Sequence, residues 1–224
     1  MFMTIKGLVF DFDGLILDTE TPEYQILEEL FQSYGTTLPL TQWSAALGSS
    51  LVAFDPMAYL EETVGRSFDR DLLFRSWKQQ SLTLIVQQPV LPGVLELIQE
   101  AQQSRLKLAV ASSSPSDWVL SHLSRLGMAD LFDIILTSDN VSHIKPHPEL
   151  YLKAVEALGI SPSEAIAFED SPNGIKAAKA AGLFCVAVLN PLTRQLDTDH
   201  ANLVIDSLAG VSLDNLIEKA NHFQ

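Results

Sequence analysis

Six polar side chains lie at the ends of short apolar runs in this sequence or in the loops that follow them. They are Asp11, Asp13, Ser112, Lys145, Glu169 and Asp170. The runs are rich in aliphatic residues, which is typical of strands buried on both faces of a parallel sheet. Because the carboxyl ends of such strands meet at one edge of the sheet, we expect the six side chains to form a single site.

Four of these side chains are carboxylates: Asp11, Asp13, Glu169 and Asp170. Held close together, they would repel one another strongly unless a divalent cation lay among them. Oxygen ligands with room for several water molecules suit Mg²⁺. The sequence therefore predicts Mg²⁺ as a cofactor at this site.

A phosphate ester is a substrate that this set of residues could process. The metal ion and the Lys145 ammonium would neutralise the charge of a phosphate dianion, and the Ser112 hydroxyl could hold one of its oxygens. Asp11 could then attack phosphorus in line. Asp13, two residues further on, would reach the leaving oxygen as a general acid and later serve water as a general base.

The run SSS leaves the serine assignment open. Any of Ser112, Ser113 and Ser114 could point to the phosphate. We favour Ser112 because it stands at the predicted strand end, and we keep Ser113 as a candidate substrate contact.

Prolines shape three of these segments. Ser114-Pro115 and Ser171-Pro172 each predict an N-cap followed by the first residue of a helix. His143 and His147 are four residues apart, as in zinc-binding helices, but the prolines at 146 and 148 exclude a regular helix through them. We therefore expect no zinc site there.

Strands and helices are predicted to alternate over most of the chain. The strands are expected at 5–10, 106–111, 133–137, 165–169, 185–189 and 202–205, and the helices at 93–104, 115–126, 148–158, 172–181 and 207–220. This order predicts an α/β fold, with a doubly wound, Rossmann-like parallel sheet covered by helices on both faces.

Residues 20 to about 88 interrupt this alternation. Helical periodicity is evident at 22–34 and 69–86, and no convincing strand falls between them. We expect a catalytic core formed by 1–16 and 89–224, and an inserted all-helical cap domain at 17–88.

Four segments taken together resemble the motifs of haloacid dehalogenase-like phosphatases. The segments are DFDGLILDT, VASSS, IKPHPELY and FEDSPNGIKAAKAAG, and they occur in the order of that family. The helical insert after the first motif is similar to the smaller cap class, which includes β-phosphoglucomutase-like proteins and sugar-phosphate phosphatases.

The resemblance implies a role for each matching residue. Asp11 would be the nucleophile and Asp13 the acid/base, with its backbone carbonyl also binding the metal. Asp170 would bind Mg²⁺ directly, whereas family members differ on whether the position of Glu169 does so. Ser112 and Lys145 match phosphate-binding positions, and Thr19 matches the hinge into the cap.

One departure from the family bears on the reaction. The mutase branch has a cap loop containing Arg, which holds a second phosphate, but the comparable stretch here is LGSSLVAFDP. Residues 20–88 also carry nine acidic against four basic residues. We therefore predict hydrolysis of a small phosphomonoester such as a sugar phosphate, with a β-phosphoglucomutase-like phosphomutase or a non-catalytic phospholigand sensor as alternatives.

Several cap residues could face the substrate. Glu20 follows the hinge and must stay near the mouth of the site, and Lys78 is a further candidate contact. Trp43, Phe54 and Tyr24 are expected in the cap core, because burial is the usual use of aromatic side chains.

The composition excludes some partners. A formal net charge of −14 disfavours nucleic acid and anionic membrane surfaces. No signal peptide and no apolar stretch long enough to span a bilayer are evident. The single cysteine, Cys185, lies in an apolar run and is predicted to be buried. We expect a cytoplasmic monomer that acts on a small phosphorylated metabolite.

Overall fold

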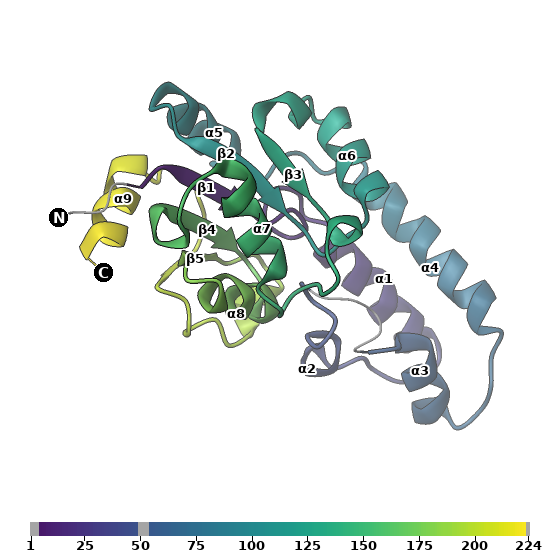
Figure 1. The fold of residues 1–224 in the computed structure, drawn as a ribbon. Coiled ribbons are helices and arrows are strands. Elements are labelled where there is room, and N and C mark those ends of the chain that lie inside the picture. The colour runs from purple at the N-terminus through teal and green to yellow at the C-terminus, as the bar shows by residue number, and fades with distance from the viewer. Residues whose placement is uncertain (1–4, 49–53, 223–224) are drawn as a thin grey trace.

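The core of the molecule is a six-stranded parallel sheet (Figure 1). The structure is a computed structural model, and it describes residues 5–48 and 54–222. The strands are β1 (Gly7–Phe10), β2 (Lys107–Ala111), β3 (Ile134–Leu136), β4 (Ala165–Glu169), β5 (Phe184–Val188) and β6 (Leu203–Ile205). Their order in the sheet is β3-β2-β1-β4-β5-β6. This order confirms the predicted doubly wound, Rossmann-like fold.

Alternate residues of each strand pack on opposite faces of the sheet. In β1, Leu8 and Phe10 join the core beneath α5 (Val94–Gln103), α6 (Ser116–Arg125) and α9 (Leu213–His222). Val9 joins the core beneath α7 (Glu149–Leu158) and α8 (Pro172–Ala180). The buried Cys185 belongs to this second core, as predicted.

Strand β1 lies at the centre of the sheet, and its register aligns the chain where the site forms. Phe10 pairs with Val110 of β2 on one side and with Phe168 of β4 on the other. The residues that follow these three positions therefore leave the sheet together at its carboxyl edge. Because β1 and β4 are also the strands between which the winding direction reverses, this edge is where a ligand crevice is expected.

A helical insert lies between β1 and α5 and forms one end of the molecule (Figure 1). It contains α1 (Glu20–Ser33), α2 (Leu40–Trp43), α3 (Pro56–Val64) and α4 (Arg70–Ile85). Its own apolar core includes Leu27, Phe31, Trp43, Leu60 and Trp77. The insert is thus all-helical over its described residues. Most of its buried apolar side chains form a core of their own, while Ile85 of α4 joins the first core of the sheet and Leu192, after β5, joins the core of the insert.

Two predictions about the elements needed correction. The insert contains the short helices α2 and α3 in addition to the two predicted ones; Asp55 caps α3 by accepting from Met57 N at 2.9 Å. The last helix begins at Leu213 rather than at 207, because Gly210 has a φ of 73° that interrupts a helix. Residues 49–53 of the predicted cap loop lie outside the described residues.

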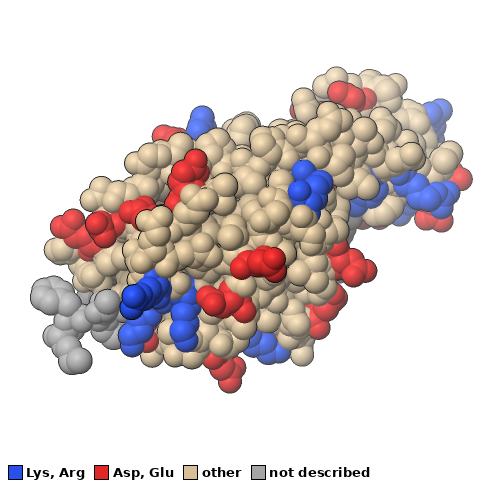
Figure 2. Space-filling model, turned by 90° about the horizontal axis from the view of Figure 1, so that it is seen from above, with Lys and Arg blue, Asp and Glu red and all other residues tan. Residues whose placement is uncertain are grey.

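Charged side chains are interspersed over the surface. On the face in Figure 2, acidic and basic residues lie among larger areas of other atoms on both the sheet domain and the helical end. That view contains no broad basic surface of the kind that binds polyanions. None of the helices in the described part of the chain combines the length and the apolar character that a bilayer-spanning helix requires.

Candidate active site

A buried ion triad occupies the carboxyl edge of β1 and β4. The Lys145 ammonium lies 2.6 Å from Asp11 Oδ1 and 2.6 Å from Glu169 Oε1. All three residues are buried, and the Tyr151 hydroxyl of α7 donates a further hydrogen bond to Glu169 Oε1. The loop before α7 thus delivers a cation to the two strands that carry the carboxylates.

The triad contains two carboxyl groups and only one ammonium group. Burial and the neighbouring Glu169 raise the pKa of Asp11 from 3.8 to about 8, although Lys145 acts in the opposite direction. Burial would lower the pKa of Lys145, but the two carboxylates outweigh it and raise that pKa above its usual range. Lys145 is therefore a permanent cation, and the surplus of negative charge calls for a second one.

The acidic group fits a hard metal ion. Oxygen atoms of Asp11, Glu169 and Asp170 all lie within 4.8 Å of one another. Asp170 Oδ2 accepts from Asn190 Nδ2 at 2.8 Å, but its buried Oδ1 has no hydrogen-bond partner within the described structure. A buried carboxylate oxygen that lacks a hydrogen-bond partner and lies beside other carboxylates is suited to bind a hard cation.

Glu169 is placed differently from Asp170. Its Oε1 is taken by Lys145 and Tyr151, and its Oε2 accepts from Ser171 Oγ at 3.4 Å. Of the two adjacent acids, Asp170 thus has the oxygen available to a metal, while Glu169 holds the lysine.

Two glycines leave the space that these acids fill. Gly14 has a φ of 78°, and a Cβ atom there would lie 2.2 Å from Asp170 Oδ2. A Cβ atom on Gly174 of α8 would lie 1.9 Å from Glu169 Oε2. Any larger residue at either position would displace a carboxylate of the site.

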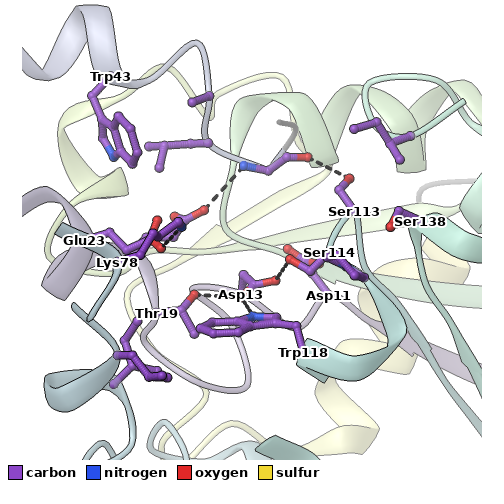
Figure 3. Close-up of a pocket in the computed structure, with 18 residues that line it drawn as sticks. Asp11, Asp13, Thr19, Glu23, Trp43, Lys78, Ser113, Ser114, Trp118 and Ser138 are labelled. Carbon is purple, nitrogen blue, oxygen red and sulfur yellow. Dashed lines mark hydrogen bonds and ion pairs between the residues drawn. The ribbon is translucent and has the colours of Figure 1, made fainter. Parts of the chain in front are cut away.

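Asp13 is held by four donors from three segments of the chain, and three of them, Thr19, Ser114 and Trp118, are drawn in Figure 3. Its Oδ1 accepts from Thr19 Oγ1 and from Trp118 Nε1, each at 2.8 Å. Its Oδ2 accepts from Ser114 Oγ at 2.6 Å and from Ser112 Oγ at 3.3 Å. The carboxylate is therefore fixed in orientation at the edge of the pocket, beside the strand end that carries Asp11.

The three serines have distinct positions. Ser112 is buried, and besides bonding to Asp13 it accepts from Ser114 N at 3.0 Å. Ser113 and Ser114 line the pocket, and Ser113 Oγ donates to the Gly48 carbonyl of the insert at 3.1 Å.

One of the two predicted Ser-Pro caps is wrong. Helix α6 begins at Ser116 with Pro115 as its N-cap, and Ser114 binds Asp13 instead of the helix. The other is confirmed, since Ser171 Oγ accepts from Gly174 N at 3.1 Å at the start of α8.

The pocket of about 600 Å³ is bounded by the strand ends on one side and by the insert on the other (Figure 3). Glu20 lines it and is buried; its Oε1 accepts from Gly48 N at 3.4 Å, and burial together with Asp170 raises the pKa of its carboxyl. Trp43 belongs to the insert core, as predicted, but also lines the pocket. Lys78 lines it too, where it is ion-paired with Glu23.

Several residues of the site were not predicted from the sequence. Trp118 and Tyr151 each lie in the first turn of a helix, and that turn follows a strand-end segment of the site. Asn190 follows β5 by two residues, so the strand-end pattern that selects Asp11 extends to it. The sequence signal that could have identified Trp118 and Tyr151 is their position in the first turn of a helix that starts at the carboxyl edge of the sheet.

A second group of possible metal ligands is exposed. His143, His147 and Glu149 lie together, with the two imidazole centroids 4.7 Å apart, although no regular helix joins them. The Glu149 carboxylate is already occupied by the backbone N–H groups of Ser142 and His143, each at 3.0 Å. These hydrogen bonds explain why the three residues lie together, because the Glu149 carboxylate acts as a clamp that holds the loop carrying Lys145.

Comparisons with known proteins agree with this architecture. Residues 8–188 match the family of haloacid dehalogenase-like hydrolases. YhcW of Bacillus subtilis (strain 168) is 43% identical over 220 residues, which cover 97% of this chain and 98% of that protein. Validoxylamine A 7'-phosphate phosphatase of Streptomyces hygroscopicus subsp. limoneus is 35% identical over 82% of this chain and 85% of its own length. The crystal structure of β-phosphoglucomutase from Clostridium difficile superposes with a TM-score of 0.76 at 26% identity, covering 98% of this chain and 99% of that one.

Proposed function

The chain belongs to the haloacid dehalogenase-like hydrolases and is a phosphoric monoester hydrolase, and we propose that it works through an aspartyl-phosphate formed on Asp11. The observation that carries the proposal is the position of Asp11 Oδ1. It is buried at the end of β1, 2.6 Å from a lysine ammonium, and the residue lines the pocket. A carboxylate so placed can meet a phosphate whose charge Lys145 helps to neutralise.

The proposed reaction has two steps. Asp11 attacks phosphorus, the bond to the leaving oxygen breaks, and Asp13 gives that oxygen a proton. Water then attacks the phosphoryl group on Asp11 while Asp13 takes a proton back, which releases phosphate and regenerates both carboxyl groups. The four hydrogen bonds fix the position of the Asp13 carboxyl group at the edge of the pocket, as both proposed proton transfers require.

We further propose that Mg²⁺ is held by Asp11, Asp170 and the backbone carbonyl of Asp13, with Glu169 adjacent. When bound, it would supply positive charge to the phosphate oxygens and so complement Lys145. The unpaired Asp170 Oδ1 supports this assignment, and the engagement of both Glu169 oxygens supports an indirect role for Glu169. Ser112 is proposed to support the phosphate site from beneath Asp13.

The substrate is proposed to be a small phosphomonoester such as a sugar phosphate, in line with the phosphorylated substrate named for the Streptomyces relative. Residues 1–16 and 89–224 would form the catalytic core and 17–88 the cap. Contacts such as Ser113 to Gly48 would help keep the cap closed over the substrate and exclude bulk water.

A substrate panel tests the proposal. The purified protein is given small phosphomonoesters with Mg²⁺, and inorganic phosphate release is measured; a parallel set contains excess chelator. We expect release from at least one sugar phosphate and its loss with chelator. Undiminished release in chelator would contradict the metal assignment, and isomerisation of β-glucose 1-phosphate without phosphate release would replace hydrolysis by mutase activity.

A further inference from the structure

The insert side of the pocket is apolar except for the Glu23–Lys78 ion pair, the buried carboxyl of Glu20 and the hydroxyl of Thr19. Trp43, Leu47, Leu82 and Ile85 line it there, and Lys78 is the sole Lys or Arg lining the pocket among the described residues. Among the described residues, a second anionic group on a substrate would therefore depend on Lys78 for a side-chain counter-charge on this side.

Lys78 is not free to supply that charge. Its ammonium is ion-paired with the Glu23 carboxylate (Figure 3). It also lies 4.5 Å from the centroid of the Trp77 ring. Trp77 Nε1 donates to the Glu23 main-chain oxygen at 3.0 Å, which ties α4 to α1 at the same point. The pair therefore lies where α4 is fastened to α1, with the Glu23 side chain 16% exposed and the Lys78 side chain 41% exposed.

The surrounding charges also oppose a second anion. Asp11, Asp13 and Glu20 line the same pocket, and Glu23 cancels the charge of Lys78. The transferring phosphate has Lys145 and the proposed metal as counter-charges, whereas a second phosphate near the insert would face apolar walls and carboxylates. Burying an anion without a partner is strongly unfavourable.

We propose that the Glu23–Lys78 pair is a specificity element that restricts the enzyme to phosphomonoesters whose leaving group carries no second anionic group. This inference rests on the proposed function, since it concerns the leaving group of the same reaction. The carboxylate of Glu23 acts by holding the Lys78 ammonium away from the substrate. The expected substrates are phosphate esters of neutral polyols or rings.

The test compares two substrates that differ by one phosphate, fructose 1-phosphate and fructose 1,6-bisphosphate, in the Mg²⁺-loaded enzyme. Wild type should favour the monophosphate in kcat/KM by about tenfold or more. Glu23→Gln frees Lys78 and should narrow that ratio about tenfold, mainly through a lower KM for the bisphosphate. An unchanged ratio in this variant, or equal use of both substrates by wild type, would overturn the inference.

Two further variants separate the pair from general charge effects. Lys78→Gln leaves Glu23 uncompensated and should widen the ratio, and it tests the inference independently if Glu23→Gln fails to fold. Glu61→Gln removes an equal charge from the insert, where Glu61 is paired with Arg70, and should leave the ratio at its wild-type value. A wild-type enzyme that releases phosphate from neither substrate nor from the wider panel would instead count against the proposed function itself.

Discussion

The two sides of the pocket are built on different principles. On the strand side, charged groups meet in a buried network in which Asp11, Glu169 and Lys145 are each within 2.6 Å of a partner. On the insert side, apolar side chains surround one neutralised ion pair, and the other ionisable group there among the described residues is the buried carboxyl of Glu20. The first arrangement suits a reaction that develops and moves charge, and the second suits selection by shape and by the absence of charge.

The first way to test this contrast is to remove the proposed nucleophile. Asp11→Asn should lower kcat by about 10⁴-fold or more, because an amide cannot form the acyl phosphate. Phosphate release over hours is the measurement. The fold should survive, since Lys145 keeps Glu169 as a partner and one buried negative charge is lost; circular dichroism and a thermal midpoint check this. Substantial turnover by a folded variant would exclude Asp11 as the nucleophile.

Removing the buried cation should affect both activity and folding. Lys145→Met leaves Asp11 and Glu169 buried without their counter-charge, which we expect to cost about 3 kcal/mol of unfolding free energy and to lower kcat about 100-fold or more. Urea unfolding and phosphate release measure the two effects. Lys153→Met, which breaks an exposed pair with Glu149, is the matched control and should change stability by well under 1 kcal/mol. Similar losses of stability and activity in both variants would contradict the prediction that the buried ion triad matters more than an exposed ion pair.

Much of the strand side was predictable because its information is local. A buried run followed within two residues by a carboxylate identifies both a strand and its ligand-bearing end, so Asp11 and Asp170 could be placed from the sequence. Ser112 was placed by the same rule, and the structure puts it behind Asp13. Asn190 obeys the rule as well, but it carries no charge that would single it out.

The insert side could not be predicted to the same depth. The Glu23 and Lys78 side chains are 55 residues apart and meet only because α1 and α4 pack in one rotational setting. Periodicity predicts which face of each helix is apolar, not which polar residues at the rim will touch. Trp118 is a similar case, because its indole reaches Asp13 from a position 105 residues away in the sequence.

Trp118 allows a test of how Asp13 is held. Trp118→Phe keeps an aromatic ring but removes the N–H group that donates to Asp13 Oδ1, so we expect kcat to fall about tenfold with a smaller change in KM. The loss should be greater for an alkyl phosphate than for p-nitrophenyl phosphate, whose leaving group needs less help from an acid. Trp43→Phe, on the insert side of the same pocket, should alter KM rather than this leaving-group dependence. Equal losses for both substrates in Trp118→Phe would indicate a purely structural role.

The smallest effect is expected at the exposed loop that positions Lys145. The backbone N–H of Ser142 and the ammonium of Lys153, with further hydrogen bonds from His143, lower the pKa of Glu149 from 4.5 to about 2. A carboxyl group whose pKa is lower in the folded than in the unfolded protein stabilises the fold at any pH above its unfolded-state pKa. That contribution is lost as the pH falls through its folded-state pKa. Glu149→Gln should therefore unfold at a lower urea concentration than wild type above about pH 5, with the difference shrinking between pH 4.5 and pH 2.

Activity should fall only about twofold in Glu149→Gln at neutral pH, because the buried triad itself still holds the Lys145 ammonium. Glu156→Gln, on the same helix, is the control for loss of one negative charge. A stability difference that stays constant down to pH 2.5 would contradict the clamp. A large loss of activity without loss of stability would show that Glu149 takes part in the charge network of the strand side. The strand side of the pocket would then include this exposed loop.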